Sequence, residues 1–331
     1  MTTLNASLPT LLDMVKLKEP DGKIASIVES LSTSNPLLQD MVWKEGNLPT
    51  GHVVTSRTGL PSVSWRKFNE GTAASKSRTD QFTEACGMLS GRSNVDCELA
   101  DLNGDKAAFR LSEDKAFMQA LNKEMETGFF YHSTKTAPEK IMGLAPRLDA
   151  ISGSAFPNQI IDWSGSSSGS DQTSVWLIVW GPDTVFGIYP KGSVGGISAK
   201  DMGEQYVLDS GGSNSFRAYS TDWTWKAGLC VKDARYLVRI CNIDTSAIAA
   251  TGHLLLDDMT RALEQVQDLD MGRPAFYCNR TIRTYLRLQA TDSVRNSTLA
   301  YDNVAGKPVL TFGGVPVRRT DALVNTEAVI S

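Results

Sequence analysis

The 331-residue sequence lacks the features that would assign it at once to a membrane, secreted or nucleic-acid-binding class. No run of 18 apolar residues is present, and the first residues carry neither the basic nor the apolar part of a signal peptide, so we expect no membrane span and no export. Charge has no dominant sign, because 33 basic residues stand against 37 acidic ones for a net charge of −4. This balance argues against sequence-specific DNA binding.

Cysteine is scarce, and its spacing matches no known framework. The count is odd and no Cys-x-x-Cys pair occurs, so neither a disulfide framework nor a zinc site is indicated. We expect reduced thiols in a cytosol. The five cysteines are Cys86, Cys97, Cys230, Cys241 and Cys278.

Nucleotide-binding motifs are also missing, because the sequence has neither G-x-x-x-x-G-K-[ST] nor G-x-G-x-x-G. One hydrolase motif is present: Gly165, Ser167 and Gly169 satisfy G-x-S-x-G. A nucleophile elbow needs a helix after the serine, whereas the residues that follow here, SVWLIVW, predict a strand. We therefore favour a Ser/Gly-rich loop and keep a soluble serine hydrolase using Ser167 as the alternative.

The other residues that could carry chemistry are dispersed. His52, His132 and His253 lie far apart, without the spacing of metal ligands. A short acidic stretch resembles the start of a calcium loop but lacks the glycine and glutamate that such a loop requires at its sixth and twelfth positions, so we predict a turn. We predict no catalytic, cofactor-binding or metal-binding residue. The acidic stretch contains Asp101, Asn103 and Asp105, and the two deviating positions are Lys106 and Ser112.

A basic segment near the C-terminus has two interpretations. Arg280, Arg283 and Arg287, interleaved with Tyr285, could contact nucleic-acid phosphates. Their spacing of three and four equally predicts the solvated face of a short helix, and the near-neutral net charge favours this second interpretation. The inward face of that helix would carry Ile282, Tyr285, Leu286 and Leu288.

The elements that the sequence does predict follow a definite order. Amphipathic segments in the first fifty residues have more apolar surface than so few residues can cover, and a long polar β-hairpin follows. Next comes a helix over residues 112–127, with Ser112 as its N-cap and Gly128 at its end. Aromatic-rich runs then predict an extended antiparallel sheet, followed by a second helix and short strands.

This series resembles the major capsid proteins of tailed bacteriophages, which have the Hong Kong 97 type fold, and more narrowly those of short-tailed phages (podoviruses). LPTGHVVTSRTGLPSVSWRKFNEGTAASKSRTDQF is similar to the extended loop, with Glu70 and Gly71 near its tip. PEKIMGLAPRL is similar to the segment after the spine helix. PAFYCNRTIRTYLRLQ and TFGGVPVRRTDAL resemble parts of the axial domain.

The resemblance implies an α+β capsid fold and a division of the chain. It implies an N-terminal arm (1–48), an extended β-hairpin loop (49–85), a mainly peripheral domain with a spine helix and an antiparallel sheet (86–240), and a mainly axial domain (241–331). The late sheet strands come before the axial motifs here, so we expect a reordered strand connectivity within the same architecture.

The resemblance further implies a non-enzymatic protein that assembles with itself. Its hexamers and pentamers would form the icosahedral shell around the double-stranded DNA of a virion, assembled in the host bacterial cytoplasm. A decoration or cement protein, a scaffolding protein and a portal are expected partners, and the DNA would be contacted non-specifically. Another ring-forming virion protein remains an alternative. Nothing selects a cross-linking pair from Lys67, Asn69 and Lys76, so we expect noncovalent assembly.

Overall fold

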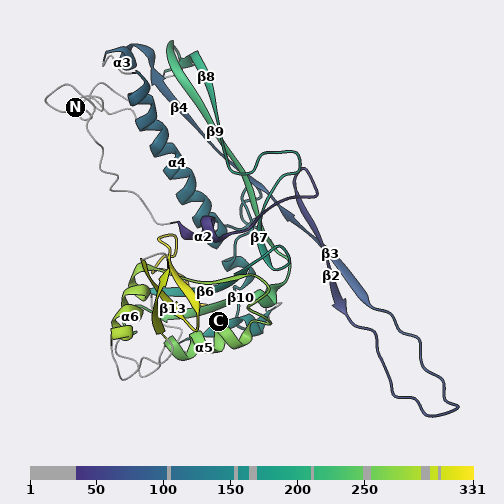
Figure 1. The fold of residues 1–331 in the computed structure, drawn as a ribbon. Coiled ribbons are helices and arrows are strands. Elements are labelled where there is room, and N and C mark those ends of the chain that lie inside the picture. The colour runs from purple at the N-terminus through teal and green to yellow at the C-terminus, as the bar shows by residue number, and fades with distance from the viewer. Residues whose placement is uncertain are drawn as a thin grey trace.

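The computed structural model describes residues 35–102, 106–152, 156–163, 170–209, 212–248, 255–291, 299–304 and 307–331. The chain forms an elongated domain, a compact domain and a hairpin that extends away from both (Figure 1). Helices and a large mixed sheet together give the α+β class that the sequence predicted. Within the described residues, no helix is long and apolar enough to cross a membrane.

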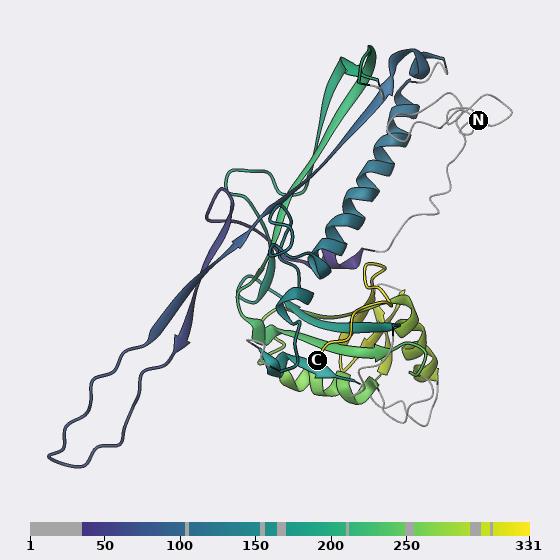
Figure 2. The same cartoon turned by 180° about the vertical axis from the view of Figure 1, so that it is seen from behind.

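The elongated domain consists of one long helix lying along a three-stranded antiparallel sheet (Figures 1 and 2). Leu121 and Met125 of the helix pack with Trp223 and Trp225 of the central strand. At the far end, Asp96 caps a short helix by accepting a hydrogen bond from the Glu98 amide. The elements are α4 (Lys106–Tyr131), β4 (Gly87–Asp96), β9 (Ser215–Val231), β8 (Ile197–Leu208) and the short helix α3 (Cys97–Asp101).

Helix α4 is longer than the sequence predicted. It begins at Lys106, which places Ser112 inside the helix rather than at its N-cap, and it continues past Gly128 to Tyr131. Both differences follow from burial, because Phe109 packs under α3 in the first turn and Phe129 and Phe130 are fully buried in the last turn. Tertiary packing therefore extends the helix past its local start and stop signals.

The compact domain is built on a mixed sheet with two helices, α5 and α6, on one of its faces. The strands run β12, β13, β14, β11, β6, and β10 also pairs with β6. Leu255 and Met259 of α5 and Ile282 and Leu286 of α6 are fully buried against this sheet. The elements are β5 (Ile160–Asp162), β6 (Gln172–Trp180), β10 (Leu237–Asp244), α5 (Leu255–Gln265), β11 (Arg273–Cys278), α6 (Arg280–Thr291), β12 (Leu299–Val304), β13 (Lys307–Phe312) and β14 (Val315–Arg319).

Strand β6 shows how the chain is shared between the two domains. The sequence places residues 172–180 in a mainly peripheral region, yet β6 lies between β10 and β11 in the sheet of the compact domain. All nine of its residues are buried, because the sheet is covered on both faces. The domain division of the sequence and the reordered connectivity both stay predictions.

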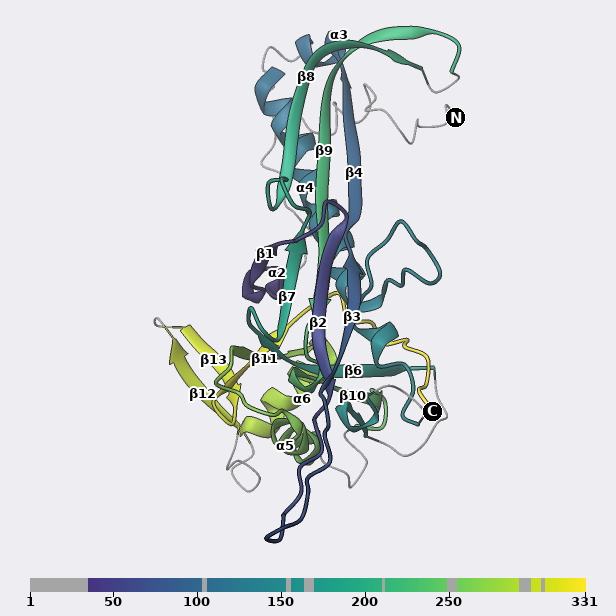
Figure 3. The same cartoon turned by 90° about the vertical axis from the view of Figure 1, so that its right-hand side faces the viewer.

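The hairpin and the two domains meet at a small junction. Strand β9 continues from the elongated sheet to pair with β7, which also pairs in parallel with β1. The hairpin strands pair antiparallel with each other, and residues 60–77 join them without regular structure (Figure 3). The junction elements are α2 (Pro36–Asp40), β1 (Trp43–Glu45), β2 (Gly51–Gly59), β3 (Arg78–Ala85), β7 (Val185–Tyr189) and the short 3-10 helices η1 (Ala145–Arg147), η2 (Pro157–Gln159) and η3 (Ala234–Tyr236).

Candidate assembly surfaces

The residues considered for catalysis do not come together. Ser167 and its glycines, His253, and Asn103 with Asp105 lie outside the described residues. His52 lies in β2, where burial lowers its pKa, and His132 follows α4, where burial also lowers the pKa of its ring. Among the described residues no group of histidine, cysteine or acidic side chains could hold a metal ion. The surfaces that the folded chain leaves uncovered are therefore the candidate functional sites.

The hairpin tip, residues 60–77, is the most exposed apolar surface of the described chain. Phe68 is 98 % exposed, Val63 is 91 % exposed, and Trp65 and Leu60 project similarly. Burying each such side chain contributes about 1.5–3 kcal/mol, so a tip standing in water forgoes most of that gain. Four large apolar side chains on one tip indicate a surface that another molecule covers.

The root of the hairpin, in contrast, is fixed firmly. Glu84 of β3 is buried and accepts two hydrogen bonds from Arg147, at 2.5 and 2.7 Å. Arg147 also donates to the carbonyl oxygens of Gly143, Met142 and Leu229, so its guanidinium joins the hairpin to the junction and to β9. A buried, bidentate pair with further hydrogen bonds satisfies both charges.

Glycine is required at the root of the hairpin, where β2 begins and β3 ends. A side-chain carbon at Gly51 would lie 2.1 Å from the carbonyl oxygen of Glu84, well inside van der Waals contact. The backbone of β2 therefore passes close to the residue that carries the ion pair. The root is rigid and the tip is exposed, an arrangement suited to presenting the tip at a defined distance from the domains.

A second root lies where the N-terminal segment enters the described structure. Leu37 of α2 is fully buried, and Asp40 accepts hydrogen bonds from Tyr277 at 2.9 Å and from Arg318 at 3.2 Å. Below α2, the buried carboxyl of Glu126 accepts a hydrogen bond from Thr320 at 2.9 Å and another from the Leu37 amide. Residues 1–34 lie outside the described residues, so the predicted arm stays a prediction beyond this root.

Glu126 is a buried acid whose pKa is shifted strongly by its surroundings. Desolvation raises its pKa from an ordinary value of 4.5 to about 7, although the hydrogen bonds from Thr320 and Leu37 act in the opposite direction. Helix α2, where the N-terminal segment enters the described structure, therefore contacts an acid, Glu126, whose pKa is near neutrality.

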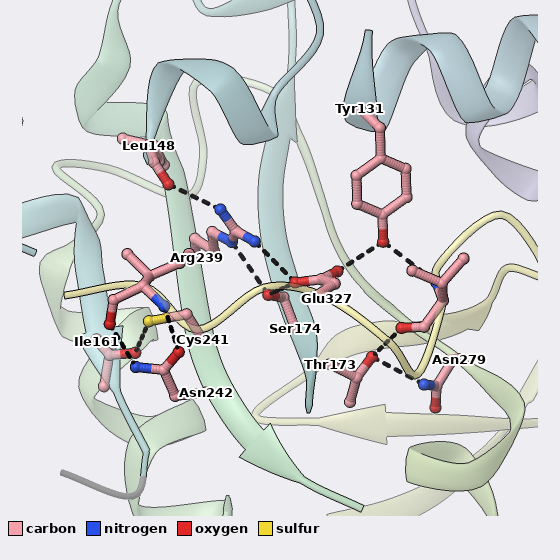
Figure 4. Close-up of polar contacts among 12 residues, drawn as sticks. Tyr131, Leu148, Ile161, Thr173, Ser174, Arg239, Cys241, Asn242, Asn279 and Glu327 are labelled. Carbon is pink, nitrogen blue, oxygen red and sulfur yellow. Dashed lines mark hydrogen bonds and ion pairs between the residues drawn. The ribbon is translucent and has the colours of Figure 1, made fainter. Parts of the chain in front are cut away.

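A buried polar network joins the C-terminal segment to both domains (Figure 4). Arg239 of β10 donates to Glu327 at 2.7 Å, to Ser174 at 3.0 Å and to the Leu148 carbonyl at 2.8 Å. Tyr131, the last residue of α4, donates to the other oxygen of Glu327 at 2.6 Å. One carboxylate near the chain end thus joins the spine-like helix of the elongated domain to the sheet of the compact domain.

The sequence did not predict this network, although one residue pointed to it. Arg239 interrupts the apolar strand LVRICNI, and a buried arginine requires an anionic partner. Nothing in the sequence selects Glu327 as that partner, because 88 residues separate the two.

The basic segment adopts a helix, as the second interpretation expected. Ile282 and Leu286 are buried and Tyr285 is half-buried, but Leu288 is 67 % exposed, so its predicted inward position is wrong. The helix packs on β14 through one narrow face, and Leu288 lies beyond its edge. The candidate cross-linking residues Lys67, Asn69 and Lys76 are all exposed on the hairpin tip, and noncovalent assembly stays a prediction.

Comparisons with known proteins agree with this geometry. A family model described as major capsid protein GP7 matches residues 19–331. A chain from the near-atomic-resolution structure of bacteriophage Epsilon15 is 34% identical, with a TM-score of 0.78, and the match covers 100% of this chain and 99% of that one. A chain of the bacteriophage JBD30 capsid shows the same fold at 11% identity, with a TM-score of 0.51 over 96% of this chain and 99% of that one. No curated protein sequence matches.

Proposed function

The chain belongs to the family of major capsid protein GP7 and is a structural protein of a phage shell, and from this premise we propose how it assembles. We propose that copies form hexamers and pentamers that close into an icosahedral shell around double-stranded DNA. The hairpin tip of each copy docks on a neighbouring copy. The serine hydrolase alternative has no support from these comparisons.

The observation that carries this proposal is the contrast within the hairpin. Its root is held by the buried pair of Glu84 and Arg147, whereas its tip exposes Trp65 and Phe68 almost completely. A monomer in water gains nothing from such an arrangement. A neighbouring copy that buried the tip would gain the hydrophobic stabilisation that the monomer leaves unused.

The other partners belong to the same proposal. A shell of copies with net charge −4 holds DNA without binding it tightly, because no strong positive field retains phosphates. A scaffolding protein, a portal and a decoration or cement protein would act with the chain during assembly in the host bacterial cytoplasm. Among the described strands β8 pairs with β9 alone, so its other edge offers a further uncovered surface on the elongated domain.

Electron microscopy of the purified, expressed chain tests the proposal. Closed shells with five- and six-fold units are the expected result, and sedimentation should give a single fast species. Monomers, or open rings and tubes only, would contradict it. The ladder that covalent links leave after boiling in detergent should be absent.

A further inference from the structure

Five arginines gather at one end of β11, from elements that the sequence does not connect. β14 pairs in parallel with β11, and the register places Arg319 opposite Cys278, two residues before α6 begins its arginine series. Arg280 and Arg319 share Asp321, and the pKa of Arg283 is lowered in part by the nearby charges of other arginines. Arg318 points to the opposite face of the sheet, where it pairs with Asp40, so it adds its charge but not its side-chain surface. We call these arginines the arginine cluster. It consists of Arg280, Arg283, Arg287, Arg318 and Arg319.

The arginine cluster has fewer counter-charges than charges. Asp321 lies 3.4 Å from Arg280 and 3.6 Å from Arg319, and Asp40 pairs with Arg318. Within the part of the chain that the structure describes, five arginines against these two aspartates leave three positive charges in excess. The chain as a whole is acidic, so the local excess is a property of this place and not of the composition.

Arg283 is the member that this imbalance affects most. Its Nε is buried and has no hydrogen-bond partner among the described residues. Its pKa is lowered, chiefly by burial and also by the charges of Arg287, Arg319 and Arg318. A guanidinium in this position is stabilised by an anion that approaches from outside the chain.

A complementary acidic surface lies at the opposite end of the same strand. Arg273, the first residue of β11, pairs with Trp180. The exposed Glu264 at the end of α5 and the exposed Asp268 and Asp270 of the loop that follows outnumber the exposed Arg273, and we call these three acidic residues the acidic turn. A strand of six residues is about 17–20 Å long, so the acidic turn cannot reach the arginine cluster of its own chain.

We propose that the arginine cluster of one copy binds the acidic turn of the next copy around each ring of the shell. This inference rests on the proposed assembly into hexamers and pentamers. Two different surfaces at opposite ends of one strand make a head-to-tail contact, and such contacts form a ring when the rotation between successive copies closes. The arginine cluster already binds carboxylates within the chain, and every neighbouring copy presents one acidic turn for each arginine cluster.

Charge reversal of each surface tests the proposal in the full-length chain. R283E/R287E reverses the arginine cluster, and D268R/D270R reverses the acidic turn, whose aspartates are exposed. K115E/K123E, on the exposed face of α4, makes the same charge change as R283E/R287E at another place and is the matched control for that variant. Assembled particles are measured by sedimentation and electron microscopy, with circular dichroism to verify the fold.

Each reversal should lower the assembled fraction about tenfold or more, because like charges then meet at every contact, whereas the control should assemble normally. The quadruple variant should again form closed shells. In a mixture of the two double variants, each copy can contact only copies of the other variant, because one variant has two acidic surfaces and the other has two basic ones. The two variants must then alternate around a ring, which is possible in a six-fold ring and impossible in a five-fold ring, so only six-fold rings should form.

Three results would overturn the inference. The first is that folded D268R/D270R assembles as well as the wild type. The second is that the quadruple variant, which combines both reversals, does not regain the assembly of closed shells. The third is normal shell formation by R283E/R287E with lost retention of DNA, because phosphates and not a second copy would then be the bound anion. If the wild-type chain itself formed no shells, the proposed function would fail instead.

Discussion

Glu84 and Arg147 form a buried, two-point ion pair that joins the extended hairpin to the body of the protein. Residues 63 positions apart thereby fix the direction in which the hairpin projects. The pair fixes the root of the hairpin, and the exposed apolar residues lie at its other end, at the tip.

Removing one partner of this pair should destabilise the chain strongly. Arg147→Ala leaves the Glu84 carboxylate buried and uncompensated, which costs about 3–5 kcal/mol in the free energy of unfolding. Urea denaturation of the unassembled chain measures this cost. Asp183→Ala, which breaks the exposed pair with Lys232, is the matched control and should change stability by about 1 kcal/mol or less. Equal effects of the two changes would contradict the assigned role.

Replacing the two aromatic side chains of the hairpin tip by alanine should impair assembly and leave folding unchanged. Trp65→Ala/Phe68→Ala removes two exposed side chains, so the free energy of unfolding of the monomer should change by no more than about 0.5 kcal/mol. The yield of shells, counted by electron microscopy, should fall sharply. Thr72→Ala truncates a polar residue of the same tip and should assemble normally. A tip that tolerates loss of both aromatics would not be a docking surface.

Glu126 should make stability depend on pH near neutrality. Because its pKa is about 7 in the folded chain and 4.5 in its ordinary state, the folded chain binds the proton more tightly. Protonation of Glu126 therefore stabilises the folded chain; this stabilisation is fully present below pH 4.5 and is lost as the pH rises through 7. At pH 8.5, Glu126→Gln should therefore raise the free energy of unfolding, measured by urea denaturation, by up to about 3 kcal/mol over the wild type. At pH 5.5 the gain should be much smaller. A difference that does not vary with pH would contradict the assignment.

The C-terminal network should depend on the charge of Glu327. Glu327→Ala leaves Arg239 buried beside Trp176 without its anion, and should cost about 3–5 kcal/mol. Tyr131→Phe removes a single donor to that carboxylate and should cost about 1–3 kcal/mol. Thermal unfolding of both variants checks the order, and a larger loss for Tyr131→Phe would be inconsistent with an arginine-centred network.

The thiols should be unreactive in the folded chain. Burial raises the pKa of Cys86 to about 11 and the pKa values of Cys230, Cys241 and Cys278 to about 12, so almost no thiolate exists at pH 8. Iodoacetamide labelling followed by mass spectrometry should modify the native chain slowly and should modify all five cysteines in urea. Rapid native labelling of Cys278 would show that its site opens.

Local signals in the sequence indicated much of this fold. Alternating and turn residues predicted the polar hairpin around Gly71, and apolar spacing predicted the helix that contains Leu121 and Met125. Both elements are decided by periodicity over a few residues, which a sequence displays directly. The ends of α4 were misplaced because Phe109 is buried under the preceding helix α3 and Phe130 is buried against Trp176, and neither tertiary contact shows in the periodicity of the helix.

By itself, the sequence determined the class of the protein: reduced cysteines, balanced charge, no nucleotide-binding motif, and an order of elements similar to phage capsid proteins. Only the tertiary structure decided which residues meet. Arg239 finds Glu327, Arg147 finds Glu84, and the arginines of α6 join those of β14. Such pairs depend on how distant segments pack, and a single sequence carries no local pattern that records it.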